Sequence, residues 1–185
     1  MPAFSPSCAS RLPVPNAINI SAARTHPNRR CDFIRNWSVL PDYASVNLNE
    51  PDCAAVIEHL EKRGIGIEVG IWTATDAARC LDLNLTARAL RLLFEIMQQE
   101  QGTALAELAA IEKCLGGAAR RKSVLLHGMD KTVWTFIKAA FARGYSTRIG
   151  FEDTCVLPDG QTAPSNAALV AAAIELKRAA VKSGA

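Results

Sequence analysis

IGIEVGIW, at residues 65–72, is the stretch of sequence that decides the fold. Successive side chains of a β-strand point to opposite faces, so these residues fall into two rows. One row is apolar and contains Ile65, Ile67, Val69 and Ile71. The other row contains Glu68 between two glycines, followed by Trp72. A parallel strand covered by helices on both faces is apolar on both. The pattern therefore favours a barrel, in which one face meets the helices and the interior carries chemistry near the carboxyl ends of the strands.

The rest of the chain alternates predicted strands with predicted helices. The strand candidates are residues 17–21, 42–48, 65–72, 91–96, 123–128 and 146–153. The helix candidates are residues 28–38, 51–63, 74–82, 102–115, 130–143 and 165–182. This alternation predicts an α/β fold whose parallel strands are adjacent in chain order. We expect residues 1–15 to form a disordered N-terminal tail, because prolines interrupt them, and residues 16–185 to form one domain.

The length limits the number of units. Six strand–helix units in 185 residues give about 31 residues per unit, and eight such units need roughly 250 residues, the usual size of a (β/α)8 barrel. The prediction is therefore an incomplete TIM barrel with about six units. A six-unit open, doubly wound sheet is the alternative that length favours, and its strand order would reverse midway.

Composition narrows the classes of function. A net charge of +3, with scattered basic residues, gives no footprint for nucleic acid or an anionic membrane surface. No apolar run approaches the ~18 residues that a membrane span needs. The six cysteines show no CxxC spacing, so we expect free thiols and a cytoplasmic, reducing compartment. Nucleotide-binding and hydrolase motifs such as GxGxxG and GxSxG are absent from the sequence. The oligomeric state stays open, a homo-oligomer included.

The densest group of functional residue types is Arg148, Glu152 and Asp153, at the end of the last predicted strand. Two neighbouring carboxylates can divide the work between a metal ligand and a base, and an arginine beside Asp153 would keep it ionised. The alternative is an ordinary ion pair at a strand end.

Three further candidates lie on other strands. Glu68 lies within a strand that we expect to be buried, where a carboxylate is costly unless it is solvated or paired. Glu68 could be solvated at the mouth of a barrel. The alternative is a buried ion pair, with Arg148 as the candidate partner. Glu95 has the same placement on its own strand. His127 ends the segment SVLLHG, where it could hold an anionic substrate or be a histidine at the core edge. No two histidines lie at metal-ligand spacing.

Four segments resemble the beta-keto acid cleavage enzymes, a family of zinc-dependent barrels. They are PDYASVNLNEPD (41–52), GIGIEVGIWT (64–73), LLHGMD (125–130) and, above all, TRIGFEDTCVLPDGQTAPSNAALV (147–170). The resemblance covers about residues 17–182 and implies an aldolase-type (β/α)8 barrel. It implies a reaction in which a beta-keto acid and acetyl-CoA give acetoacetate and a new CoA thioester.

The resemblance also implies roles for individual residues. Glu152 matches the zinc-binding glutamate, and Asp153 matches the acid that deprotonates the keto acid together with Arg148. Glu68 matches a glutamate at the mouth of the active site. Ser45 and Asn47 fall on a strand that carries substrate-contacting side chains.

The sequence departs from the family at the metal site. The family binds zinc through a His-x-His pair, which this chain does not contain. By the resemblance, the first predicted strand of this chain corresponds to the third strand of the family's barrel. Catalytic zinc sites use three protein ligands, so we expect weak zinc binding or none. Three interpretations stay open: a beta-keto acid cleavage enzyme or an inactive fragment of one, a small open-sheet α/β enzyme with an acid-based site, and a non-catalytic binding protein.

Overall fold

The computed structural model describes residues 19–21 and 29–183, so the expected tail lies outside the described residues. The described residues form a sheet of five parallel strands in the order β1-β2-β3-β4-β5. The strands are β1 (Asn19–Ser21), β2 (Tyr43–Asn47), β3 (Gly66–Ile71), β4 (Arg91–Ile96) and β5 (Val124–Gly128). The order follows the chain without a reversal, so the predicted α/β fold with adjacent parallel strands is confirmed and the doubly wound order is not found.

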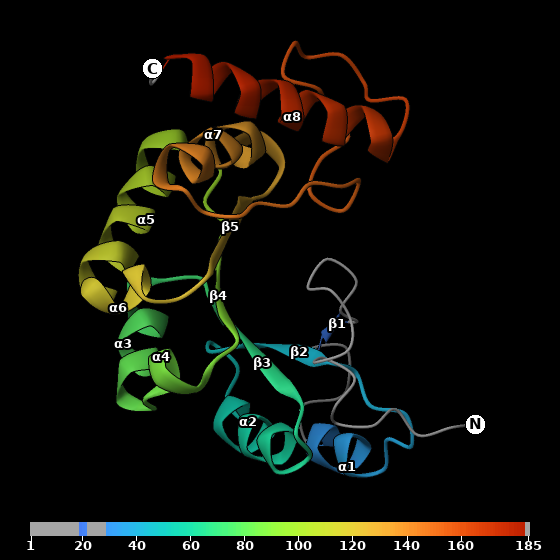
Figure 1. Ribbon diagram of the computed structural model, residues 1–185, viewed down its shortest axis with the longest axis vertical. Helices are drawn as coiled ribbons and strands as arrows, with labels where there is room; N and C mark the ends of the chain where they lie inside the picture. The colour runs from blue at the N-terminus through green and yellow to red at the C-terminus, as the bar shows by residue number, and fades with distance from the viewer. Residues whose placement is uncertain (1–18, 22–28, 184–185) are drawn as a thin grey trace.

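The helices follow the predicted positions, with small additions. They are α1 (Arg30–Arg35), α2 (Cys53–Lys62), α3 (Ala74–Asp82), α4 (Leu85–Arg88), α5 (Gln101–Leu115), α6 (Gly117–Arg120), α7 (Val133–Arg143) and α8 (Asn166–Ser183), with the 3-10 turn η4 (Asp130–Thr132) before α7. The helices lie around the outside of a curved sheet (Figure 1). None of the helices that the structure describes is both long and apolar enough to cross a membrane.

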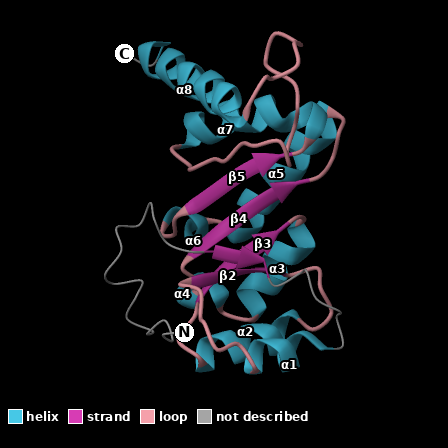
Figure 2. Cartoon of the chain, turned by 90° about the vertical axis from the view of Figure 1, so that its right-hand side faces the viewer, coloured by secondary structure: helices cyan, strands magenta, loops and turns pink. Residues whose placement is uncertain are grey.

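The two rows of each strand lie in different surroundings, as the sequence predicts. The row of Ile67, Val69 and Ile71 is buried in the core together with helix residues such as Leu60 and Leu108. Matching rows of β2, β4 and β5 join the same core. Figure 2 shows the helices that lie behind the strands, on the side of this core. The opposite row holds Ser45, Glu68, Arg91, Glu95 and His127, and so gathers polar side chains on the concave side of the sheet.

The sixth predicted strand does not form. Within residues 146–153, Ser146 alone makes a bridge, to Leu125 of β5. The chain then turns, because the Gly150 carbonyl accepts from the Asp153 amide at 2.9 Å and the Asp153 carboxylate accepts from the Gly150 amide at 3.0 Å. Ile149 packs with residues of α7 and α8 as expected. A strand over residues 146–153 would place Phe151 on the same face as Ile149, but Phe151 is 45% exposed because it lies in this turn.

Gly128, at the carboxyl end of β5, packs closely against α7 and the 3-10 turn before it. An added Cβ at Gly128 would lie 2.5 Å from Phe136 Cδ2 and 2.9 Å from Thr132 Oγ1. We therefore expect Gly128→Ala to lower the free energy of unfolding by about 1–3 kcal/mol, the usual cost of overpacking. Urea denaturation of the variant measures this loss.

Gly117→Ala is the matched control, because its added Cβ would meet only Arg121 Nη1, at 3.7 Å. Its stability should stay within about 1 kcal/mol of the original chain. Equal destabilisation by the two substitutions would contradict the predicted close approach at Gly128.

Candidate active site

The candidate site lies at the carboxyl ends of neighbouring strands. Glu95 is the penultimate residue of β4, His127 is the penultimate residue of β5, and the two are paired in the sheet register. Trp72 directly follows β3, and Arg148 and Asp153 come from the segment after α7. Active sites of parallel α/β proteins form at this edge, where the carboxyl ends of the strands meet.

His127 is the centre of the group. It is 1% exposed, and each ring nitrogen faces a carboxylate. Nε2 lies 3.5 Å from Glu95 Oε1, and Nδ1 lies 3.4 Å from Asp153 Oδ1. These contacts are ion pairs rather than well-aligned hydrogen bonds. A buried imidazole between two carboxylates is stable in the charged form, since that form compensates both anions.

Asp153 is held by the turn that replaces the sixth strand. Its side chain is 1% exposed. Oδ2 accepts from the Gly150 amide at 3.0 Å, while Oδ1 faces His127 and, at 3.4 Å, Arg148 Nη2. The Asp153 carbonyl also accepts from the Asp130 amide at 2.8 Å, which ties the turn to the end of β5. The carboxylate is therefore fixed in direction and nearly shielded from solvent.

Arg148 is shared among three carboxylates. Its Nη2 lies 3.4 Å from Asp153, 3.5 Å from Glu152 and 3.9 Å from Glu95. The Arg148 side chain is 39% exposed and the Glu152 side chain 65%. Arg148 Nε has no hydrogen-bond acceptor within the described part of the chain. Arg148 is thus the cation of this group that combines solvent access with an unused donor.

The charges of the group stabilise one another. Burial alone would lower the pKa of His127, but Asp153 and Glu95 outweigh it and hold that pKa above its ordinary value. Burial would raise the pKa of Asp153, yet His127 and Arg148 hold it below its ordinary value. The pKa of Glu95 is lowered against the same burial effect, by His127, Arg148 and Trp72. Opposite charges at this range favour the ionised forms of all three groups.

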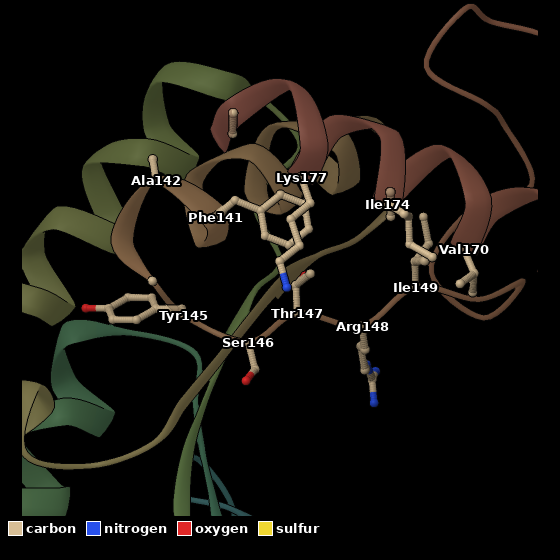
Figure 3. Close-up of a pocket in the computed structure, with 13 residues that line it drawn as sticks. Phe141, Ala142, Tyr145, Ser146, Thr147, Arg148, Ile149, Val170, Ile174 and Lys177 are labelled. Carbon is tan, nitrogen blue, oxygen red and sulfur yellow. The ribbon is translucent and has the colours of Figure 1, made fainter. Parts of the chain in front are cut away.

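A cavity of about 300 Å³ adjoins the group and is lined in part by Arg148, Phe151, Glu152 and Asp153. This volume lies at the lower end of the range for small-molecule sites. A larger, mostly apolar groove of about 1290 Å³ runs between α8 and residues 145–149. In Figure 3 the Arg148 side chain points away from α8, whereas Lys177 reaches from α8 toward Thr147. Arg148 lines both hollows, whereas Glu152 and Asp153 line the smaller one.

Glu68 lies apart from this group. Its carboxylate pairs with Arg91 and accepts a hydrogen bond from Ser45 Oγ at 2.5 Å. The predicted alternative of an ion pair is right, but the partner is Arg91 rather than Arg148. Glu68 is in register with Arg91, four residues before Glu95 on β4. Four residues of strand span about 13 Å, so Glu68 and Ser45 lie well below the level of Glu95 in the sheet.

Asn47 also stands outside the group. It pairs with Gly70 in the sheet, and an added Cβ at Gly70 would collide with its side-chain oxygen. Glycine at position 70 therefore leaves room for the Asn47 side chain on the concave side. Of the residues predicted for the site, Arg148, Glu152, Asp153 and His127 are brought together, whereas Ser45, Asn47 and Glu68 are not in contact with them.

Two residues were missed as site candidates. The Trp72 indole donates to Glu95 Oε2 at 2.8 Å, and Arg91 donates to the Tyr43 hydroxyl at 3.1 Å besides pairing with Glu68. Trp72 shares the concave row with Glu68 and Gly70, so the alternation of residues 65–72 was a signal for its placement. Arg91 opens β4 and had no such pattern.

The described residues do not fit a zinc site. Within residues 19–21 and 29–183, no group of three or more His, Cys, Asp or Glu side chains is arranged to hold a metal ion. Glu152, the expected ligand, points into solvent beside Arg148. Both nitrogens of His127 are occupied by carboxylates.

Comparison with known proteins decides the family. The family model of beta-keto acid cleavage enzymes matches residues 16–183. The chain belongs to this family. The suspected resemblance is thereby confirmed, and the residues of the charged group lie inside the matched region.

Comparison with solved structures concerns the fold alone. The chain is similar to 3-dehydroquinate dehydratase from Enterococcus faecalis, an enzyme of TIM-barrel type, with a TM-score of 0.52 and 13% sequence identity. The similarity covers 69% of this chain and 57% of that enzyme, so the chain spans little more than half of its length. No curated protein matches the chain significantly.

The ligand set leads to a prediction about zinc. The purified chain of 185 residues should contain far less than one zinc per molecule by elemental analysis, because the described residues offer Glu152 no two further ligands of the kind a catalytic site needs. Glu152→Ala should leave the zinc content unchanged. Acyl exchange between a beta-keto acid and acetyl-CoA should be negligible for the same reason.

Stoichiometric zinc would contradict this prediction. The residues to replace first would then be His127 and His26, the latter outside the described residues.

Proposed function

We propose that this chain carries out the proton-transfer chemistry of a beta-keto acid cleavage enzyme, with a beta-keto acid bound at Arg148 and deprotonated by Asp153. One observation carries the proposal: Arg148 and Asp153 lie 3.4 Å apart and both line a cavity formed by residues 148–153 and Asn166, while Asp153 also faces His127 near the carboxyl end of β5. The family match supports the class of substrate.

Arg148 suits the carboxylate of the substrate. A guanidinium binds carboxylates through paired N–H donors. The Arg148 guanidinium is partly exposed and its Nε donor has no acceptor among the described residues. Nε itself is buried, so a carboxylate that bound the guanidinium would reach this donor only as Arg148 moves away from the three carboxylates that now share it.

Asp153 is the group that would take the proton. Arg148 and His127 both face its Oδ1, so movement of Arg148 toward a substrate would leave that oxygen facing His127 and the substrate. The Gly150 amide holds Oδ2 at 3.0 Å and so keeps Oδ1 directed at His127 and Arg148. A proton between two carbonyl groups is acidic enough for a positioned carboxylate to act on it.

The full reaction that the family resemblance implies needs no oxidant or reductant, and without the zinc ligands we expect this chain to perform its proton-transfer step alone. Asp153 removes a proton from C2 of the keto acid, and C2 attacks the thioester carbonyl of acetyl-CoA, which releases CoA as thiolate. The thiolate attacks the original keto carbonyl, and the bond between that carbonyl and C2 breaks. The C2 carbanion then takes the proton back from Asp153, and the products are acetoacetate and the CoA thioester of the remaining acyl group.

Zinc, which the family resemblance implies, would act as a Lewis acid on the keto oxygen when bound. Since the described residues do not fit zinc, Arg148 and Asp153 have proposed roles in the proton transfer alone.

The proposal includes the architecture. We propose that the sheet is part of a barrel and that its polar, concave side is the interior of that barrel. Three findings support this: the strand order, the helices on one face of the sheet, and the similarity to a dehydratase of TIM-barrel type. A localisation in the cytoplasm and the absence of nucleic-acid partners remain part of the same proposal.

Exchange of the C2 hydrogens of acetoacetate for deuterium, followed by proton NMR, tests the proton transfer without requiring acyl exchange. We expect the chain to accelerate this exchange, and Asp153→Asn to slow it by about 10²–10⁴-fold, the usual effect of losing a general base. Arg148→Met should raise the acetoacetate concentration needed for half-maximal rate.

Asp159→Asn is the matched control, because Asp159 also accepts a backbone hydrogen bond, from Gln161 at 3.0 Å, but lies in an exposed turn. Its exchange rate should equal that of the unmodified chain. An Asp153→Asn protein that folds and exchanges at the full rate would refute the assignment. No acceleration by the unmodified chain would favour a non-catalytic binding protein.

A further inference from the structure

Trp72 and Glu95 join the group from two different strands. Trp72 follows β3 and donates its indole N–H to Glu95 Oε2 at 2.8 Å. Glu95 is on β4 and turns its other oxygen, Oε1, toward His127 Nε2 at 3.5 Å. The Glu95 side chain is 16% exposed, so both of its oxygens are directed by protein groups. Neither residue has a role in the proton transfer described above.

The arrangement around His127 suits one protonation state. A neutral imidazole has one N–H and one lone pair, whereas an imidazolium has two N–H donors. Because both nitrogens face carboxylate oxygens, a neutral ring would turn its lone pair toward an anion. The groups that face the ring are Glu95 from β4, and Asp153 and Arg148 from the segment after α7. Two anions thus surround the ring against one cation.

A charged His127 matters when Arg148 changes partner. Asp153 is 1% exposed, and a buried carboxylate left without a cation is strongly destabilised. If Arg148 turns to a substrate, His127 is the cation that remains beside Asp153, at 3.4 Å. His127 in turn needs Glu95 to stay charged at 1% exposure.

We propose that Trp72 and Glu95 are positioning residues, which hold His127 as an imidazolium and so keep Asp153 in place as the base when Arg148 binds the substrate. The consequence for catalysis rests on the proposed function. The placement of His127 by Glu95 and Trp72 does not, so the two can be tested apart. The net raised pKa of His127 agrees with this arrangement.

The titration of His127 by NMR tests the placement directly. The chain has three histidines, so His127→Gln identifies the signal of His127 in a histidine-labelled sample. Glu95→Gln keeps the shape of the side chain and removes its charge. We expect it to lower the pKa of His127 by about one unit, the effect of losing an opposite charge at this distance. Trp72→Phe should lower the pKa of His127 by a smaller amount, because Glu95 keeps its charge but loses the hydrogen bond that orients its carboxylate.

Trp134→Phe is the matched control for Trp72. Its indole also donates a hydrogen bond of 2.8 Å, but to the Val156 carbonyl. This control should leave the titration of His127 unchanged. If Glu95→Gln does not fold, Glu95→Asp serves instead: the charge stays but moves away, and the pKa of His127 should fall part of the way. An unchanged pKa of His127 in the folded Glu95 variant, or equal shifts in the two tryptophan variants, would overturn the proposal.

The pH dependence of acetoacetate exchange tests the consequence. A histidine with a raised pKa is charged at low pH and loses its charge as the pH rises through that pKa, so the rate should fall on the alkaline side. In Glu95→Gln and Trp72→Phe this fall should occur at lower pH. If the pKa of His127 shifts in these variants but the alkaline fall of the exchange rate stays at the same pH, the positioning role is refuted and the proposed function still stands. Absence of exchange in the unmodified chain would refute the proposed function, and the titration would still decide the placement.

Discussion

A β-strand has two rows of side chains, and the helices that the structure describes cover one row of this sheet. The covered row is apolar throughout β2–β5 and supplies most of the core. This constraint places every charged side chain of the strands on the other, concave row. Glu68, Arg91, Glu95 and His127 all occupy it, and none would be tolerated beneath the helices without a partner. The position of the candidate site therefore follows from the way the sheet buries its apolar face.

The concave row holds two charged groups of different character. Near the amino ends, Glu68, Ser45, Arg91 and Tyr43 form a connected set in which the buried carboxylate has both an ion pair and a hydroxyl donor. Such a set stabilises the sheet and leaves little for a ligand. Near the carboxyl ends, Arg148 is shared among three carboxylates and keeps an unused donor among the described residues. An arginine with an unused donor beside a cavity is typical of a binding site rather than of a structural ion pair. Of these two groups, the one around Arg148 has this feature.

The sequence predicted the parts that depend on local pattern. Alternation within residues 65–72 was enough to assign the faces of β3, and the order of strands followed from the repeated strand–helix units. It could not show which charges meet, because that depends on register between strands: Glu68 lies opposite Arg91, and Glu95 opposite His127. The sixth strand failed for a related reason. STRIGFED has the alternation of a strand, but hydrogen bonds between Gly150 and Asp153 turn the chain there. The same turn directs Asp153 toward His127, so the failed strand and the predicted site have one cause.

The site combines fixed and movable components. Glu95 and His127 stand side by side on strands held by a parallel ladder, and the Trp72 indole restrains Glu95 further. Arg148 and Glu152 project from a segment with a single bridge to the sheet, and both are partly or largely exposed. Moving a cation away from a buried carboxylate is costly unless a second cation stays. In the proposed site His127, at 1% exposure between Glu95 and Asp153, is that second cation, so Arg148 could leave Asp153 for a ligand while the proposed base stays compensated.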